Sequence, residues 1–193
     1  MDTDEKTMRD RIDSCRPERV LRFCPKCGSE RFGSRTGKSF SCRDCGFEFY
    51  INAAAAVVAL IEDDRGRLLL VRRAREPMKG TLDLPGGFVD PGETLEEALR
   101  REIREELNLD IESFSFFCSC PNTYPYGGIV YYTIDLTFVC TVRDLLRVRA
   151  GDDAGEHLFV SPEHIRLEDI GLRSIREITS RYIASKTKKE VQS

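Results

Sequence analysis

Three glutamates at helical spacing are the residues of this sequence best suited to chemistry. Glu102, Glu105 and Glu106 stand at i, i+3 and i+4, so on a helix their carboxylates project from one side. Their mutual repulsion costs an exposed helix about a few tenths of a kcal/mol per pair, and a bound divalent cation reverses that sign. Hard oxygen ligands suit Mg²⁺ or Mn²⁺, which also polarise phosphates for attack by water. The spacing therefore indicates phosphoanhydride hydrolysis, although three glutamates alone fit a solvated face paired with neighbouring arginines at least as well.

A glycine-rich segment just before this helix favours the catalytic interpretation. Gly86 and Gly87 let the backbone approach a ligand closely, and Pro91-Gly92 makes a tight turn ahead of a helix amino end that attracts anions. Glu93 stands where it can cap the helix or pair with Arg101. Together the loop and the helix predict a metal-assisted phosphate site.

The run from Gly87 to Leu109 resembles the signature box of the Nudix hydrolases, Gly-x5-Glu-x7-Arg-Glu-aliphatic-x-Glu-Glu-x-Gly-aliphatic. Eight of its nine defined positions match. The exception is Asn108 in place of glycine, and because asparagine tolerates the left-handed conformation of a helix C-cap, we expect the same turn. The resemblance implies an α+β fold, an α/β/α sandwich around a mixed sheet, from about Ala53 to Ala184.

The resemblance also implies roles for individual residues. The implied ligands of Mg²⁺ or Mn²⁺ are Glu102, Glu105, Glu106 and the carbonyl of Gly87. Glu102 or a partner carboxylate would activate water, with Arg101 orienting the glutamates and Glu93 fixing Arg101. In several Nudix enzymes a loop carboxylate outside the box serves as base or further ligand, and Glu156, at the end of the acidic segment 151–156, is the expected one.

Candidate substrate-binding residues lie outside the metal ligands. Arg72 and its neighbour Arg73 can meet phosphates, and Phe88, Tyr124 and Tyr126 can stack on a base. Each of these alone is more often a surface arginine or a core aromatic. The expected substrate class is therefore nucleotide-like without being unique.

Two Cys-x-x-Cys pairs form a second constellation. Cys24 and Cys27 are separated by 14 residues from Cys42 and Cys45, a spacing that lets four thiolates surround one tetrahedral Zn²⁺. A glycine follows the second cysteine of each pair and permits the positive φ of a metal-binding knuckle. Because protein fills all four positions, the zinc would be structural. The other four cysteines are expected to be core or partly buried thiols.

A four-cysteine ribbon before a Nudix domain is similar to the NADH pyrophosphatase arrangement, which implies cleavage of a dinucleotide such as NADH or NAD-capped RNA. That subfamily carries a Ser-Gln-Pro-Trp-type motif, whereas this chain has Ser119–Tyr126 downstream of the box and no tryptophan. Pro125 lies about sixteen residues past the box. A proline at that distance resembles the pattern of the ADP-ribose pyrophosphatases instead. The predicted reaction is hydrolysis of the pyrophosphate linkage in a nucleoside diphosphate derivative of NADH, NAD or ADP-ribose type.

A different class of function stays open beside the enzyme. The domain can instead sense a nucleotide, with the ribbon binding nucleic acid, and the residues that support this idea are Arg31, Arg35, Lys38, Arg43, Phe32 and Phe40. The net charge of −3 provides no bulk attraction to nucleic acid, so we favour a structural or interface role for the ribbon.

The remaining expectations concern organisation. We expect a polar lead-in at 1–22, the zinc ribbon at 23–50, the Nudix domain at 51–185 and a frayed basic tail at 186–193. Strands are predicted at 53–61, 67–73, 111–118, 129–142 and 157–160, and helices at 94–108 and 172–184. The longest apolar run, 53–61, is too short to cross a membrane and no signal peptide is evident, so we expect a cytoplasmic protein. The family resemblance also implies a homodimer.

Overall fold

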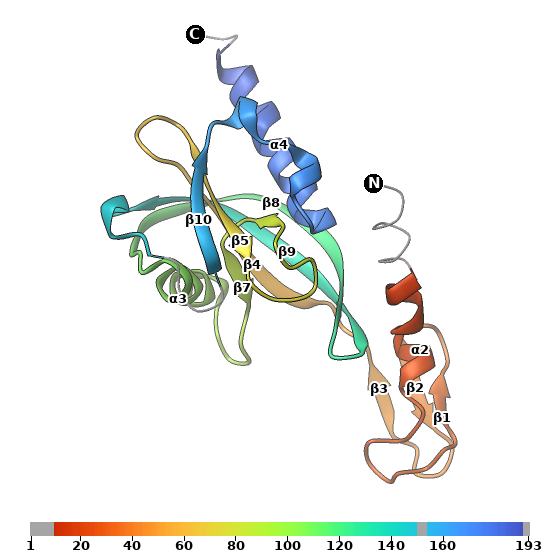
Figure 1. Ribbon diagram of the computed structural model, residues 1–193. Helices are drawn as coiled ribbons and strands as arrows, with labels where there is room; N and C mark the ends of the chain where they lie inside the picture. Colours follow the sequence, from red (N-terminus) through yellow and green to blue (C-terminus); the bar gives the residue numbers. More distant parts are fainter. Residues whose placement is uncertain (1–9, 150–153, 191–193) are drawn as a thin grey trace. The chain divides into compact units, whose positions relative to one another are not determined.

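The computed structural model describes residues 10–149 and 154–190, and the chain divides into two compact units (Figure 1). The first runs from the N-terminus to Ala54 and also contains Thr123–Thr133, the end of a long hairpin. The second contains Ala55–Asn122 and the chain from Ile134 onward. The hairpin end thus groups with the ribbon, which no sequence boundary indicated.

The first unit is a small antiparallel sheet with a short helix. Its elements are α2 (Pro17–Val20), β1 (Phe32–Ser34), β2 (Ser39–Cys42) and β3 (Glu48–Tyr50). The buried cluster of its ribbon consists of Phe32 and Phe40, stacked 5.6 Å apart, with Cys24 and Cys42. The lead-in is helical at 10–14 and again from Pro17, which occupies the first turn of α2 as its fixed φ favours. So small a core needs a further cross-link to hold its shape.

The second unit is built on two sheets. One has the strand order β10–β5–β6 and the other β7–β4–β9–β8. Their bounds are β4 (Ala54–Ile61), β5 (Leu68–Arg73), β6 (Leu82–Asp83), β7 (Gly86–Phe88), β8 (Ile111–Tyr126), β9 (Ile129–Val142) and β10 (Ala154–Val160). The two long strands β8 and β9 continue into the hairpin end that belongs to the first unit. A parallel bridge between Leu82 and Ile170 adds to the antiparallel pairs of β5.

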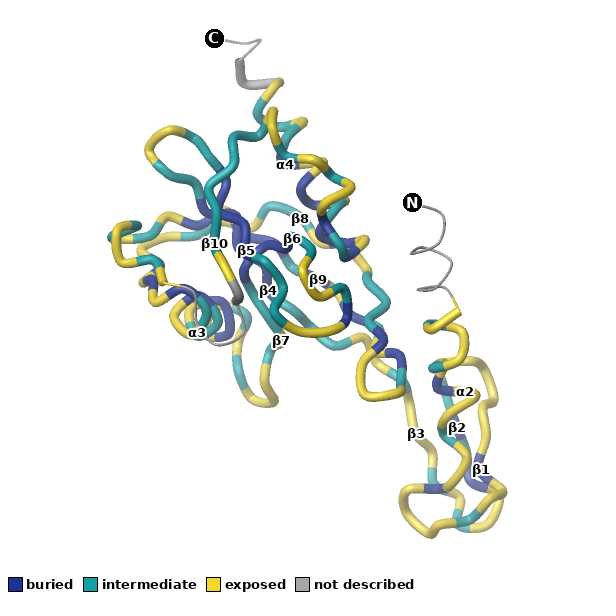
Figure 2. The backbone as a smooth tube through the Cα atoms, viewed as in Figure 1, coloured by how far each residue is buried: buried dark blue, intermediate teal, exposed yellow. Residues whose placement is uncertain are grey.

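Helices cover both faces of the strands. In β4, Val57, Ala59 and Ile61 belong to the core beneath α3 (Leu95–Leu107), while Val58 and Leu60 are buried on the alternate positions. The continuous apolar run is therefore buried on both sides, as its composition indicated. Figure 1 shows α3 and α4 (Arg173–Glu190) on opposite sides of the strands, and Figure 2 shows β4 and β5 as the most buried segments. The α/β/α arrangement and the α+β class are as predicted.

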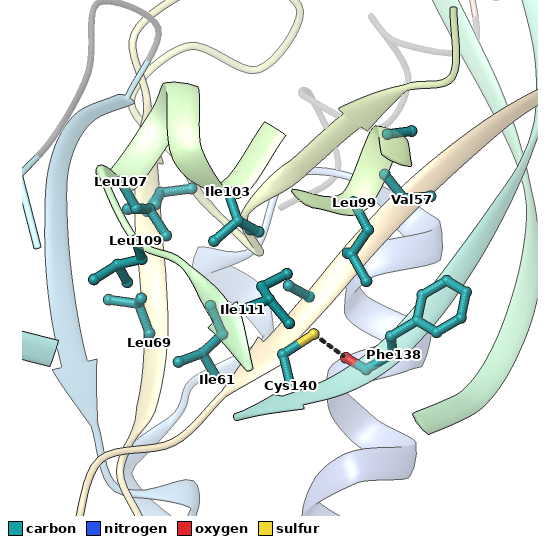
Figure 3. Close-up of a cluster of buried hydrophobic side chains, with 13 residues drawn as sticks. Val57, Ile61, Leu69, Leu99, Ile103, Leu107, Leu109, Ile111, Phe138 and Cys140 are labelled. Carbon is teal, nitrogen blue, oxygen red and sulfur yellow. Dashed lines mark hydrogen bonds between the residues drawn. The ribbon is translucent and has the colours of Figure 1, made fainter. Parts of the chain in front are cut away.

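The core beneath α3 is apolar and closely packed (Figure 3). Leu99, Ile103 and Leu107 of the helix, each four residues from the next, are fully buried on one side of it. The Cys140 thiol donates to the carbonyl of Phe138 at 3.6 Å, and burial raises its pKa to about 12, so it is an inert core thiol. This packing holds α3 in one orientation over the strands.

Both ends of α3 are capped by local sequence. The Thr94 hydroxyl accepts the amide of Glu97, whose carboxylate accepts the amide of Thr94 in return. At the other end Asn108 is left-handed, with φ 56° and ψ 35°, and its amide donates to the carbonyl of Arg104. The predicted C-cap without glycine is thus confirmed.

Several elements differ from the sequence-based prediction. β6 and β7 form in a Gly/Pro-rich stretch that carried no strand signal, and β8 is eight residues longer than predicted. The expected frayed tail is wrong at its start, because α4 extends through Glu190 and the Lys186 ammonium lies 2.5 Å from Glu62. Within 10–149 and 154–190, no helix is both long and apolar enough to span a bilayer.

Candidate active site

The carboxylate of Glu102 lies directly against the backbone of the glycine loop. A methyl group on Gly87 would stand 2.5 Å from its carboxyl carbon, so only glycine allows this approach. The Glu102 side chain is 15% exposed, and burial raises its pKa while the guanidinium of Arg101 opposes that shift. The structure therefore places one of the predicted metal ligands, partly desolvated, beside the predicted carbonyl ligand.

Glu106 is held by Gly86, the residue before Gly87 in the glycine loop. Its Oε2 accepts the amide of Gly86 at 3.0 Å, a contact between the end of α3 and the start of β7. Gly86 has φ 144°, and a Cβ there would stand 2.0 Å from the carbonyl oxygen of Val57. The loop conformation that presents Gly87 to Glu102 thus depends on glycine at position 86 as well.

Arg101 connects the glutamates of the box. Its Nε and Nη2 donate to the two carboxylate oxygens of Glu93 at 2.8 and 2.9 Å, a bidentate pair. Its Nη1 donates to Glu102 at 2.8 Å and to Glu105 at 3.3 Å, and Nη2 also reaches the carbonyl of Phe88 at 3.0 Å. The Glu93 bonds raise the pKa of Arg101 and lower that of Glu93. This geometry fits the predicted roles of Glu93 and Arg101.

The donor set suits a hard divalent cation. Glu102, Glu105 and Glu106 supply only oxygen donors, and the Glu105 side chain is 61% exposed. Mg²⁺ and Mn²⁺ prefer such carboxylate ligands and retain water or phosphate in the other positions. The residues present therefore fit the cation that the sequence pattern predicts.

The two charged site residues predicted outside the box, Arg72 and Glu156, lie side by side. Glu156 of β10 is directly opposite Arg72 of β5, and its carboxylate lies 3.1 Å from the Arg72 Nε. Arg72 also donates to the carbonyl of Gly80 at 2.8 Å. Both side chains are more than 40% exposed, so a substrate phosphate or a bound ion can compete for them. The acidic residues at 152 and 153, from the same predicted loop, lie outside the described residues.

The predicted stacking aromatics are divided between the two units. Phe88 belongs to the second unit and is 40% exposed. Tyr124 and Tyr126 belong to the first, with ring centroids 6.1 Å apart and Tyr126 58% exposed. Tyr124 is half-buried, and none of the three rings belongs to the hydrophobic core beneath α3.

The four cysteines of the ribbon form a compact sulfur cage. The sulfurs of Cys24 and Cys45 are 3.7 Å apart, as are those of Cys27 and Cys42, and all four lie within 4.8 Å of one another. Tetrahedral zinc with bonds of about 2.3 Å needs sulfurs about 3.8 Å apart. Both following glycines have the positive φ expected of knuckles, 75° and 68°. The cage therefore fits structural zinc.

An ion pair that the sequence patterns do not indicate lies close to the glycine loop. Arg73 Nη1 lies 2.5 Å from Asp83 Oδ2, and both side chains are at most 16% exposed. The sequence predicts a phosphate contact for Arg73 and no role for Asp83. A carboxylate in a two-residue strand has no periodic pattern that would mark it as buried.

Residues 52–182 match the family model of the NUDIX domain, more than half of the chain. The chain therefore belongs to the Nudix family.

Among curated relatives, it is 40% identical over 115 residues to an ADP-ribose pyrophosphatase of Methanocaldococcus jannaschii, covering 58% of this chain and 64% of the relative. It is 33% identical over 117 residues to the NAD-capped RNA hydrolase NudC of Yersinia pestis, covering 61% of this chain and 44% of the relative. The matches thus span less than two thirds of either relative's length.

Solved structures show the same fold. A Nudix hydrolase from Nitrosomonas europaea superposes with a TM-score of 0.62 and 25% identity, covering 86% of this chain and 92% of that one. A MutT Nudix hydrolase from Burkholderia pseudomallei superposes with a TM-score of 0.57 and 25% identity, covering 66% of this chain and 95% of that hydrolase.

Proposed function

We propose that this protein is a divalent-metal-dependent hydrolase that cleaves the pyrophosphate linkage of a nucleoside diphosphate derivative of ADP-ribose or NAD type. The observation that carries the proposal is the arrangement around Glu102. Its carboxylate lies against Gly87, and Arg101 ties it to Glu93 and Glu105. An acidic face with no function would not need a loop shaped around one carboxylate.

The cation would be held by Glu102, Glu105, Glu106 and the Gly87 carbonyl. The cation would neutralise charge on the substrate phosphates and make the phosphorus more susceptible to attack by water. The chain's own residues then have two tasks: to keep the carboxylates in register, and to accept a proton from the attacking water.

Glu102 is our proposed proton acceptor. Burial already raises its pKa, which brings a carboxylate closer to the basicity that general-base catalysis requires at neutral pH. Arg101 holds it through one oxygen, Oε1. Glu156 is the alternative acceptor, paired with Arg72 on the adjacent strand.

Within this class we place ADP-ribose before NAD. The relative at 40% identity is named for ADP-ribose, and the relative at 33% for NAD-capped RNA. The absence of tryptophan, which the NADH-type motif contains, points the same way. Both substrates share an adenosine diphosphate moiety, so the ranking concerns only the group beyond the second phosphate.

The test is hydrolysis of a substrate panel with Mg²⁺ or Mn²⁺, comparing wild type with Glu105→Gln and Glu96→Gln. The panel contains ADP-ribose, NAD, NADH, an NAD-capped oligonucleotide and dNTPs, with products separated by chromatography. We expect AMP and ribose 5-phosphate from ADP-ribose, and a loss of about a hundredfold or more in Glu105→Gln. Glu96 is exposed in the first turn of α3, so its variant controls for helix charge and should keep full activity.

Tight nucleotide binding without turnover would instead support the sensor hypothesis. The ribbon gives that alternative little electrostatic support. Residues 23–50 contain five Lys and Arg against three Asp and Glu, and a zinc ion with four thiolates carries two net negative charges. The charges cancel, so the ribbon as a whole has no positive charge to attract nucleic acid, and we propose that its zinc is structural. On the family resemblance alone we also propose a homodimer, which analytical ultracentrifugation tests.

A further inference from the structure

The Arg73–Asp83 pair lies at the start of the segment that carries the catalytic glycines. Asp83 is the last residue of β6, three positions before Gly86, and is 7% exposed. Its Oδ2 lies 2.5 Å from the Arg73 guanidinium and its Oδ1 accepts the amide of Leu84 at 2.8 Å. Both oxygens of one buried carboxylate are therefore used to fix the chain direction at Leu84.

Every residue from this point to the metal site is held by a specific contact. The carbonyl of Pro85 accepts the amide of Ala59 at 2.9 Å, and the amide of Gly86 donates to Glu106 at 3.0 Å. Gly87 then lies against Glu102. Four consecutive residues, each with a specific contact, thus connect Asp83 to two of the proposed metal ligands.

Arg73 also holds the loop on the other side of β6. Its Nε donates to the carbonyl of Pro77 at 2.8 Å, and its backbone pairs with Thr81 at 3.0 Å. The guanidinium therefore joins the loop before β6 to the residue that ends it. Burying an ion pair gives little net stability compared with apolar side chains of the same volume, so we assign this pair a geometric role.

We propose that Asp83, held by Arg73, is a positioning residue that sets the Gly86–Gly87 loop for metal binding and catalysis. This inference rests on the proposed function but makes a claim of its own about metal affinity. Asp83 touches neither substrate nor metal, and it acts through the backbone of Leu84 to Gly87. Groups that orient metal ligands from outside the ligand set typically change metal affinity by about 10- to 100-fold.

The test compares Asp83→Asn with Asp63→Asn. Asp63 is a matched control, because it also pairs with an arginine, Arg67, at 2.7 Å and accepts backbone amides, but it lies in the turn after β4. The readouts are the Mn²⁺ dissociation constant from the free-ion EPR signal, kcat and KM, hydrogen exchange of the Gly86 amide, and Tm.

For Asp83→Asn we expect Mn²⁺ affinity to fall about tenfold, kcat to fall about 10- to 100-fold with KM nearly unchanged, and the Gly86 amide to exchange faster. Asp63→Asn should lower Tm without changing Mn²⁺ affinity or kcat. Equal Tm losses in both variants, with Mn²⁺ affinity, kcat and Gly86 exchange unchanged in each, would overturn the inference.

If Asp83→Asn does not fold, the double variant Arg73→Met with Asp83→Leu replaces the pair by apolar side chains and removes the unpaired charge. A folded double variant with weak Mn²⁺ binding supports the positioning role, and one with wild-type Mn²⁺ binding contradicts it. If wild type hydrolyses nothing on the panel, the proposed function fails. The Mn²⁺ and exchange measurements then still decide the role of Asp83.

Discussion

The two proposed metal sites of this protein are supported in opposite ways. The glutamates of α3 project from a helix whose other face is buried in an apolar core with Leu99, Ile103 and Leu107 fully enclosed. In the ribbon, two of the cysteines, Cys24 and Cys42, are themselves part of a buried cluster whose other buried members are Phe32 and Phe40. We therefore expect the second unit to fold without a cation at the glutamates, and the ribbon to need zinc to hold its fold.

Zinc removal is the largest expected effect. Structural zinc contributes about 10–16 kcal/mol of apparent binding free energy in small zinc domains, far more than the ribbon core can replace. A chelator, or Cys42→Ser, should remove the dispersed amide resonances of residues 24–50 while those of α3 persist. The measurement is a ¹⁵N correlation spectrum with zinc quantified in parallel. Chelation of Mg²⁺ should leave the resonances of both the ribbon and α3 in place. Loss of the α3 signals on zinc removal would contradict the expectation that only the ribbon depends on its metal.

Substitutions at two adjacent glycines of the second unit should affect different properties, stability in one case and metal binding in the other. Gly86→Ala places a methyl 2.0 Å from the Val57 carbonyl at φ 144°, so we expect a loss of about 3 kcal/mol in unfolding free energy. Gly87→Ala meets only the end of the flexible Glu102 side chain, which can swing away. That variant should keep its stability in urea denaturation but bind Mn²⁺ about tenfold more weakly by EPR. Equal destabilisation of both variants would contradict this distinction.

The pH dependence of stability should have opposite signs at two carboxylates of the site. Arg101 lowers the pKa of Glu93, so Glu93 stabilises the fold above its ordinary pKa of about 4.3 and loses that contribution as pH falls through the lowered pKa. Burial raises the pKa of Glu102, so its ionisation destabilises the metal-free fold as pH rises through the raised pKa.

Urea denaturation of metal-free protein between pH 3 and 7 tests this pair. Glu93→Gln should be less stable than wild type near neutral pH, with the gap closing in acid. Glu102→Gln should gain relative to wild type as pH rises. Parallel curves for the two variants would show that the Arg101 network does not set these pKa values.

The helix C-cap gives the smallest effect. Asn108 already has the left-handed conformation, so Asn108→Gly should raise the unfolding free energy by about 0.5 kcal/mol and Asn108→Ala should lower it by about 1 kcal/mol. Thermal unfolding measures both. A large loss in Asn108→Gly would show that its side chain, which lies 3.5 Å from the carbonyl of Arg147, does more than adopt the turn.

What the sequence alone determined is local. The box glutamates, the left-handed Asn108 and the cysteine spacing all depend on residues close together in the chain, where helical periodicity and knuckle geometry decide which side chains meet.

What only the tertiary structure decided involves partners far apart in the sequence. The strands β6 and β7, the Glu106 bond to Gly86, the Arg73–Asp83 pair and the Lys186 contact with Glu62 arise only after the chain has packed. Burial of a charge or a glycine loop depends on what lies opposite it in space, and no short-range pattern records that.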